Sequence, residues 1–232
     1  FQSPTEVQQR VIPAALAGTD LQICAPTGSG KTASFLLPLL HQLPWPAGNS
    51  TEVPAPLALI VVPTRELAAQ VGQVAQTLVA EAASAPKVCL VQGGEALDDQ
   101  IAALAAGCEL LVDTPGRLLE LVRQNAVRLD LVQHLVLDEA DRLLDMGFRR
   151  ELDALLSLLT ARSQTLLFSA TFPPEVQALA ESLLRAPQII SIELPVENNA
   201  RETYGYCVNK SSKAALLLQL LRQLGEERAL VF

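Results

Sequence analysis

Hydrophobic residues in this chain form short unbroken runs that alternate with longer segments of mixed apolar and polar residues. Short continuous runs are typical of strands buried on both faces of a parallel sheet, and mixed segments are typical of amphipathic helices. The repeated strand–turn–helix order therefore predicts an α/β fold, a mostly parallel sheet with helices on both faces. The predicted strands are residues 21–24, 57–62, 87–91, 109–112, 133–137, 164–168 and 188–192.

The domain boundary is predicted from a change of composition at residues 194–201, where Pro195, Asn198 and Asn199 indicate a linker. Residues 1–193 form the predicted α/β domain. Residues 202–232 are predicted to begin a second domain, with a strand at 203–208, a helix at 211–223 and a strand at 228–232. Because the chain starts with Phe1 instead of Met and stops within this second unit, we expect a fragment of a longer protein.

The predicted helix of the second unit has an apolar face that a strand–helix–strand piece cannot bury alone. We expect this face to pack on the first domain or on a neighbouring copy. Exchange through the linker would produce a domain-swapped homodimer. The face consists of Leu216, Leu217, Leu220, Leu221 and Leu224.

Charge and cysteine content limit the functional classes. The net charge of −8, from 25 acidic and 17 basic residues, argues against broad nucleic-acid binding unless basic residues cluster locally. The four cysteines are far apart, and two lie in apolar runs, which favours reduced thiols and a cytoplasmic protein. The sequence contains no apolar stretch typical of a membrane span or signal peptide.

Residues 25–32 form a glycine-rich turn between the first predicted strand and a helix. Gly28 and Gly30 allow backbone N–H groups to surround an anion, and the helix N-terminus adds positive charge. Lys31 can reach the outer phosphates of a nucleotide, and the Thr32 hydroxyl can bind Mg²⁺. The turn therefore predicts a phosphate-binding loop. The alternative is a turn that only joins a strand to a helix.

Carboxylates follow the predicted strand 133–137 directly, as Asp138, Glu139 and Asp141. One carboxylate can hold Mg²⁺ while its neighbour orients or deprotonates a water for attack on the terminal phosphate. The alternative is an acidic helix N-terminus favoured by the helix dipole. Ser169 and Thr171 follow strand 164–168 and are expected to bond a carboxylate across the same edge.

Polar turns follow three other predicted strands, and the carboxyl ends of parallel strands meet at one edge, where ligands collect. These turns predict an anion-binding ledge, although each could also be an ordinary helix cap with a solvated arginine. The ledge residues are Pro63, Thr64, Arg65, Gly93, Gly94, Thr114, Pro115, Gly116 and Arg117.

Gln8 has two interpretations. It lies three residues after Thr5, the spacing of a capping box at a helix N-terminus. Its amide, which is both donor and acceptor, could instead recognise the edge of a purine base. The sequence alone leaves both open.

Taken in order, these motifs resemble the DEAD-box family of ATP-dependent RNA helicases, and specifically its first RecA-like, P-loop domain. Residues 138–141 read Asp-Glu-Ala-Asp, and the phosphate loop begins with Ala25, as it does in the family. The resemblance covers nearly the whole chain, and its specificity comes from the ordered series of motifs.

The resemblance implies ATP and Mg²⁺ as cofactors. Gln8 would select adenine, and Phe1 would stack on its ring. Asp138 would hold the metal through water together with Thr32, and Glu139 would position the attacking water. The residues implied to bind the phosphates are Thr27, Gly28, Ser29, Gly30, Lys31 and Thr32.

The resemblance also implies RNA as a partner. The ledge residues would bind the RNA backbone without reading sequence, and Asp141 would link hydrolysis to RNA through Ser169 and Thr171. A second RecA-like domain supplies further arginines in the family, so this fragment alone is expected to bind nucleotide but to hydrolyse it very slowly.

Three functions fit these implications. The first is an RNA-dependent ATPase that unwinds or remodels short RNA duplexes when full length. The second is an ATP-gated RNA clamp or scaffold in a ribonucleoprotein complex, which needs the same residues. The third, a DNA translocase, is disfavoured by Gln8 in its setting and by the unaltered Asp-Glu-Ala-Asp sequence.

Overall fold

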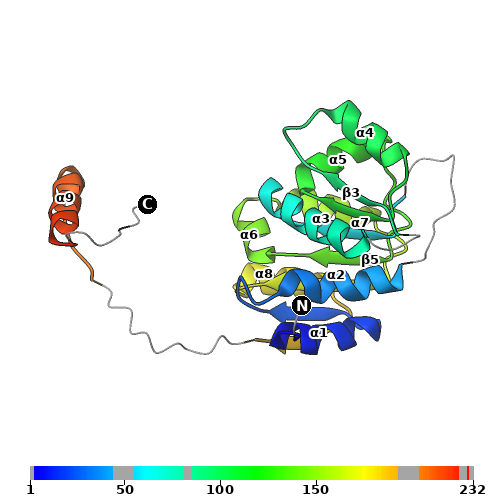
Figure 1. Ribbon diagram of the computed structural model, residues 1–232, viewed down its shortest axis with the longest axis horizontal. Helices are drawn as coiled ribbons and strands as arrows, with labels where there is room; N and C mark the ends of the chain where they lie inside the picture. Colours follow the sequence, from blue (N-terminus) through cyan, green and yellow to red (C-terminus); the bar gives the residue numbers. More distant parts are fainter. Residues whose placement is uncertain (1–2, 44–54, 81–84, 193–203, 225–228, 230–232) are drawn as a thin grey trace. The chain divides into compact units, whose positions relative to one another are not determined.

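The computed structural model describes residues 3–43, 55–80, 85–192, 204–224 and 229 (Figure 1). The chain divides into two compact units, Phe1–Leu194 and Pro195–Phe232, which are considered separately. Phe1, the predicted linker 194–201 and most of the predicted strand 228–232 lie outside the described residues.

The described part of the first unit is built on a seven-stranded sheet with the order β3-β4-β2-β5-β6-β1-β7. Every strand pair in it is parallel, which confirms the predicted α/β class. Each predicted strand is present with its bounds shifted by at most one residue at either end. The strands are β1 (Leu21–Cys24), β2 (Ala58–Val61), β3 (Val88–Val91), β4 (Leu110–Asp113), β5 (His134–Leu137), β6 (Gln164–Ser169) and β7 (Gln188–Ser191).

Helices cover both faces of this sheet and create two apolar cores. Adjacent residues of a strand point to opposite faces, so Leu59 belongs to one core and Ile60 to the other. One core contains α1 (Glu6–Leu16), α2 (Lys31–Gln42) and α3 (Arg65–Val79). The other contains α4 (Leu97–Ala105), α5 (Pro115–Arg123), α6 (Ala140–Asp145), α7 (Arg149–Leu158) and α8 (Pro174–Leu183).

Buried polar side chains fix the amino-terminal edge of the sheet. Asp20, which precedes β1, accepts backbone N–H groups from Thr165 at 2.7 Å and Arg185 at 2.8 Å. Gln164 donates to the carbonyl oxygens of Ala15 at 2.7 Å and Thr19 at 3.0 Å. These bonds connect the start of β1 to β6 and to the segment after α8, and so keep β1 in register within the sheet.

The second unit contains a 3₁₀ turn (Lys210–Ser212) followed by α9 (Lys213–Leu224). The predicted strand at 203–208 is wrong for its described part, because residues 204–208 have no regular secondary structure. A strand needs a neighbouring strand for its hydrogen bonds, and the described residues of this unit contain none. The domain swap stays a prediction.

Candidate nucleotide and nucleic-acid site

The turn between β1 and α2 has the backbone geometry of an anion cradle. Gly28 and Gly30 have left-handed φ angles of 81° and 95°. At Gly30 a side chain is also excluded by space, because a Cβ atom would lie 2.7 Å from Gln8 Nε2. Thr27 and Gly28 are exposed, and the Ser29 hydroxyl donates to the Pro26 carbonyl at 2.8 Å. The amides of this turn and of the α2 N-terminus can therefore bind phosphate.

Lys31 is the first residue of α2 and is only 7% exposed. Its ammonium donates to the Ala25 carbonyl at 3.1 Å, which holds the charge over the loop. A buried cation that donates to a backbone carbonyl is well suited to a phosphate oxygen.

Asp138 follows β5 and is 2% exposed. Its Oδ1 accepts the Glu139 N–H at 2.9 Å. Burial raises the pKa of Asp138 to about 6, although the charge of Lys31 acts in the opposite direction. Lys31 and Asp138 are thus near enough to interact, although they are 107 positions apart in the sequence.

Glu139 has an unusual backbone conformation, with φ 52° and ψ 53°, in the left-handed region. A residue with a Cβ atom rarely adopts this conformation, and such strain is frequent at active sites. The conformation lies at the N-cap of α6 and re-aims the chain directly after the strand. Glu139 Oε2 makes a long contact of 3.8 Å with Arg142 Nε, which leaves its carboxylate able to take another partner.

Asp141 joins α6 to the segment after β6. Its Oδ2 accepts the Thr171 hydroxyl at 2.9 Å and the Thr171 N–H at 3.1 Å. Its own N–H donates to the Ser169 hydroxyl at 3.2 Å. Burial opposes ionisation of Asp141, but the hydrogen bonds from Thr171, Arg142 and Ser169 outweigh it and lower its pKa. The structure therefore brings the three predicted coupling residues into one network.

The donor atoms present fit Mg²⁺. The Thr32 hydroxyl and the Asp138 carboxylate are hard oxygen donors, which this ion prefers. Within the described residues no group of three or more His, Cys, Asp or Glu side chains could hold a metal. Mg²⁺ commonly binds through one or two carboxylates together with substrate phosphates, so a partial protein set suits it.

The predicted ledge is held together by its two arginines. Arg65 Nη1 donates to the Gly93 carbonyl at 3.0 Å. Arg117 Nη1 donates to the Glu95 carbonyl at 3.3 Å, while its Nε pairs with Glu120 at 3.1 Å. Both arginines therefore fix the loop after β3 against the turns after β2 and β4.

Helix capping accounts for only part of the ledge. The Thr64 hydroxyl accepts the Leu67 N–H at 3.2 Å and so caps α3, as the alternative interpretation expected. Thr114 is the N-cap of α5 but has no side-chain capping bond, and Pro115 occupies the first turn of that helix. Gly94 is constrained by its φ of 90° and by Arg65, whose guanidinium occupies the place of a Cβ atom.

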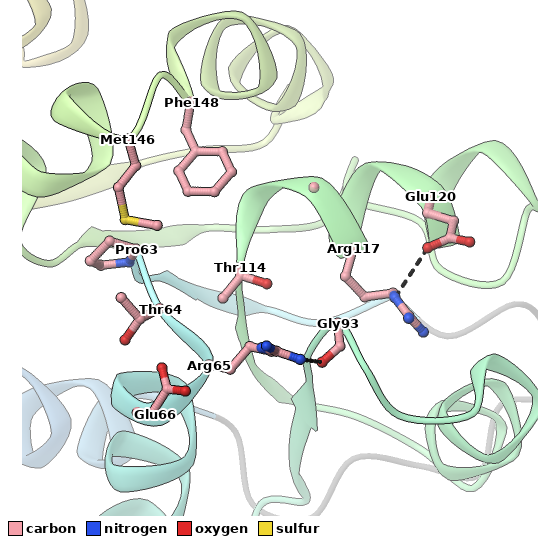
Figure 2. Close-up of a pocket in the computed structure, with 11 residues that line it drawn as sticks. Pro63, Thr64, Arg65, Glu66, Gly93, Thr114, Arg117, Glu120, Met146 and Phe148 are labelled. Atoms are coloured by element: carbon pink, nitrogen blue, oxygen red, sulfur yellow. Dashed lines mark hydrogen bonds and ion pairs between the residues drawn. The ribbon is translucent and has the colours of Figure 1, made fainter.

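The ledge borders a pocket of about 470 Å³ (Figure 2). Sequence analysis missed four of its lining residues, Glu66, Glu120, Met146 and Phe148. Met146 and Phe148 come from the α6–α7 region and lie across the pocket from Arg65 and Gly93 (Figure 2). Met146 is apolar, and sequence alone favours a core position for such a residue. In the structure its side chain is 52% exposed. The predicted ledge residues in the lining are Pro63, Thr64, Arg65, Gly93, Thr114, Gly116 and Arg117.

Gln8 makes both the capping contact and a contact with the phosphate loop. Its Oε1 accepts the Thr5 N–H at 3.0 Å, and its Nε2 donates to the Gly30 carbonyl at 3.2 Å. The capping interpretation is therefore correct, and the adenine interpretation stays a prediction. Phe1 lies outside the described residues.

The fold and this edge define a RecA-like α/β domain with a phosphate-binding loop. The family model for DEAD/DEAH box helicases matches residues 5–179. The chain belongs to the DEAD/DEAH box helicase family, and this region is the family's N-terminal RecA-like domain.

Similar proteins agree with this assignment. The chain is 40% identical over 237 residues to a protein named probable ATP-dependent RNA helicase DDX4 from Sus scrofa, covering 98% of this chain and 32% of that protein. It is 41% identical over 198 residues to DEAD-box ATP-dependent RNA helicase 52A from Oryza sativa, covering 79% and 33%. The chain thus spans about a third of the length of these relatives.

Solved structures give the same result for the fold. The yeast DEAD-box splicing factor Prp28 superposes with a TM-score of 0.78 at 30% identity, over 96% of this chain and 54% of that chain. A hypothetical ATP-dependent RNA helicase from Sulfolobus tokodaii gives 0.73 at 32% identity, over 83% and 54%. In the part of this chain that the structure describes, no helix has the length and apolarity that crossing a membrane requires.

The raised pKa of Asp138 predicts a stability cost that depends on pH. The folded state holds the proton more tightly than the unfolded state, so the free energy of unfolding falls as the pH rises through about 6. We expect Asp138→Asn to stabilise the nucleotide-free chain by up to about 3 kcal/mol above this pH, and to give no gain below about pH 4. Chemical denaturation across the pH range measures this difference.

Asp130→Asn is the control, because the hydrogen bond from Arg128 lowers the pKa of Asp130 and its neutralisation should not stabilise the fold. Equal free energies of unfolding for the wild type and Asp138→Asn at high pH would contradict the predicted cost of burying the ionised Asp138 carboxylate.

Proposed function

We propose that this chain is the ATP-binding domain of an RNA-dependent ATPase that unwinds or remodels short RNA duplexes as part of the full-length protein. The observation that carries the proposal is that one sheet edge holds both the phosphate loop and the ledge. The hydrogen bonds of Asp141 with Ser169 and Thr171 join two of the turns at this edge. The family membership and the names of the relatives support the same function.

ATP binding is attributed to the loop at the start of α2. The loop amides and Lys31 take the phosphates, and Gln8 recognises the adenine edge, with Phe1 stacked on the ring. Gln8 supports this assignment by its contact with the Gly30 carbonyl, which joins it to the loop. Gln8 selects the base, because polar groups at the edge of a wrong base are left unpaired.

Hydrolysis is attributed to the Asp138–Glu139 pair. Asp138, through water, and Thr32 would hold Mg²⁺, which would supply positive charge against the phosphates. Glu139 orients the attacking water and accepts its proton. The strained backbone at Glu139 supports this role, because such conformations are frequent at active sites.

RNA binding is attributed to the ledge. Its backbone amides and the hydroxyl of Thr114 suit phosphate and sugar oxygens, which carry no sequence information. Arg65 and Arg117 are the cationic groups of the ledge, and the carboxylates of Glu66 and Glu120 line the same pocket. We place this activity in a reducing compartment such as the cytoplasm. The described cysteines support this placement because all are free thiols.

An ATP-gated RNA clamp uses the same residues and is separated from an unwinding enzyme by strand-separation assays on the full-length protein. A DNA translocase is the less favoured alternative. Equal stimulation of ATP hydrolysis by DNA and by RNA would support it.

The roles of Lys31 and Glu139 are tested together by substitution. Lys31→Ala should weaken ATP binding at least about ten-fold, because the buried charge partner of the phosphates is lost. Glu139→Gln should keep ATP affinity within about three-fold while lowering kcat of the full-length protein about a hundred-fold or more. Calorimetry and a turnover assay measure the two effects.

Lys87→Ala and Glu175→Gln are matched controls at exposed positions of the first unit outside the site and should behave as wild type. Normal turnover by Glu139→Gln would remove the assigned role of Glu139.

The adenine role of Gln8 is tested by Gln8→Glu, which keeps the capping oxygen but loses the amide donor. We expect the preference for ATP over GTP to fall about ten-fold or more. Thermal melting measures the separate stability cost of losing the bond to the Gly30 carbonyl. Gln9→Glu is the control, because Gln9 bonds the Pro4 carbonyl at the exposed side of the same turn. Unchanged base discrimination in Gln8→Glu would leave Gln8 with its capping role alone.

A further inference from the structure

Asp113 is a buried carboxylic acid with no role in the site described above. It is the last residue of β4 and is 0% exposed. It lies directly before Thr114, where the ledge turn after β4 begins. Its side chain does not line the ledge pocket.

Asp113 holds the first residues of two ledge turns. Its backbone carbonyl accepts the N–H of Val62 at 3.0 Å, and Val62 precedes the Pro63 turn. Its side-chain Oδ1 accepts the N–H of Thr114 in a short hydrogen bond. The carboxyl group therefore acts directly on the Thr114 turn, and the backbone of the same residue is bonded to the strand that leads into the Pro63 turn.

The second carboxyl oxygen, Oδ2, has no hydrogen-bond partner among the residues that the structure describes. An unpaired buried carboxylate is costly, whereas a neutral carboxyl group is tolerated much better. Burial raises the pKa of Asp113 well above its usual range, against the opposing effects of the Thr114 hydrogen bond and the charge of Arg117.

The charged groups around Asp113 lie on the helices and not on the neighbouring strands. Arg117, on α5, is a charged side chain that acts on the pKa of Asp113, and it opposes the effect of burial. The neighbouring strand β2 has no ionisable side chain, and β3 has only Cys89. The remaining ionisable groups at the near ends of α3 and α5 are Arg65, Glu66 and Glu120. The helix α4, which shares a core with α5, follows Glu95 and carries Asp98 and Asp99 in its first turn.

We propose that Asp113 is a positioning residue of the ledge, and that RNA backbone binds more tightly when its carboxyl group is protonated. The inference rests on the proposed RNA-binding function of the ledge. A neutral Asp113 leaves Glu120, which pairs with Arg117 at 3.1 Å, as the carboxylate that competes with phosphate for the charge of Arg117. An ionised Asp113 places a negative charge beneath the Thr114 turn, where it repels phosphate and competes for the charge of Arg117.

The direction of the pH effect follows from linkage. A bound phosphate favours the neutral form of a nearby carboxyl group, so RNA binding is coupled to proton uptake. The affinity for RNA therefore falls as the pH rises and Asp113 ionises.

The experiment measures binding of a single-stranded uridine oligonucleotide to the full-length protein by fluorescence anisotropy, with a saturating non-hydrolysable ATP analogue and Mg²⁺. For wild type, the RNA Kd should rise about three- to ten-fold between about pH 5.5 and about pH 8.5. Asp113→Asn is isosteric and always neutral. After subtraction of the pH effects that both proteins share, its Kd should stay within about two-fold of the low-pH wild-type value.

Asp130→Asn is the matched control, because it changes the net charge equally at a carboxylate that Arg128 keeps ionised. It should retain the pH dependence of wild type. Calorimetry in buffers of different ionisation enthalpy gives a second readout, in which wild type takes up protons on binding RNA and Asp113→Asn takes up fewer.

A pH profile of Asp113→Asn that equals the wild-type profile would overturn the inference while leaving the proposed function intact. So would a wild-type affinity that does not change with pH. Failure of both proteins to bind the oligonucleotide at any pH would instead contradict the proposed function and remove the inference with it. Thermal melting of both proteins separates these results from a loss of folding.

Discussion

The pairing of β1 with β6 determines where the rest of the nucleotide site lies. Cys24 is in register with Ser169, and the pairing continues one residue further, where the Ala25 N–H donates to the Ser169 carbonyl at 3.1 Å. The phosphate loop therefore starts beside the hydroxyl that binds the backbone of Asp141. Because β5 pairs with the other side of β6, Asp138 lies at the same edge. The nucleotide site is a consequence of strand order.

Burial then sets the electrostatics of this edge. Lys31 and Asp138 are both nearly inaccessible to solvent, and each has few protein partners for its charge. A buried charge without a partner destabilises the fold, and binding of a phosphate by Lys31 and of a cation by Asp138 reduces this cost. The ledge differs, because its arginines have protein partners. Arg65 is exposed and donates to the Gly93 carbonyl, whereas Arg117 has a side chain that is 13% exposed and pairs with Glu120.

The strands and the phosphate loop could be predicted because their physical causes are local. Buried parallel strands are continuous apolar runs, and Gly28 and Gly30 are required by φ angles that other residues rarely adopt. The double contact of Gln8 could not be predicted, because its second partner, Gly30, is brought near only by the packing of α1 on α2. The unpaired Oδ2 of Asp113 likewise depends on which atoms surround it in three dimensions.

Other differences also come from tertiary structure. Met146 and Phe148 join the ledge pocket through the turn between α6 and α7, and nothing in their local sequence indicates a surface role. The predicted strand before α9 is not formed by its described residues, because a strand depends on a neighbour that the described part of its unit does not supply.

The most direct test of the account is the rate of ATP hydrolysis by the full-length protein with RNA and with DNA of the same sequence. The account predicts that single-stranded RNA raises the rate at least about ten-fold and that DNA has little effect, because a protein that contacts the sugars distinguishes RNA by its 2′-hydroxyl groups. Equal stimulation by both nucleic acids, or by neither, would contradict it.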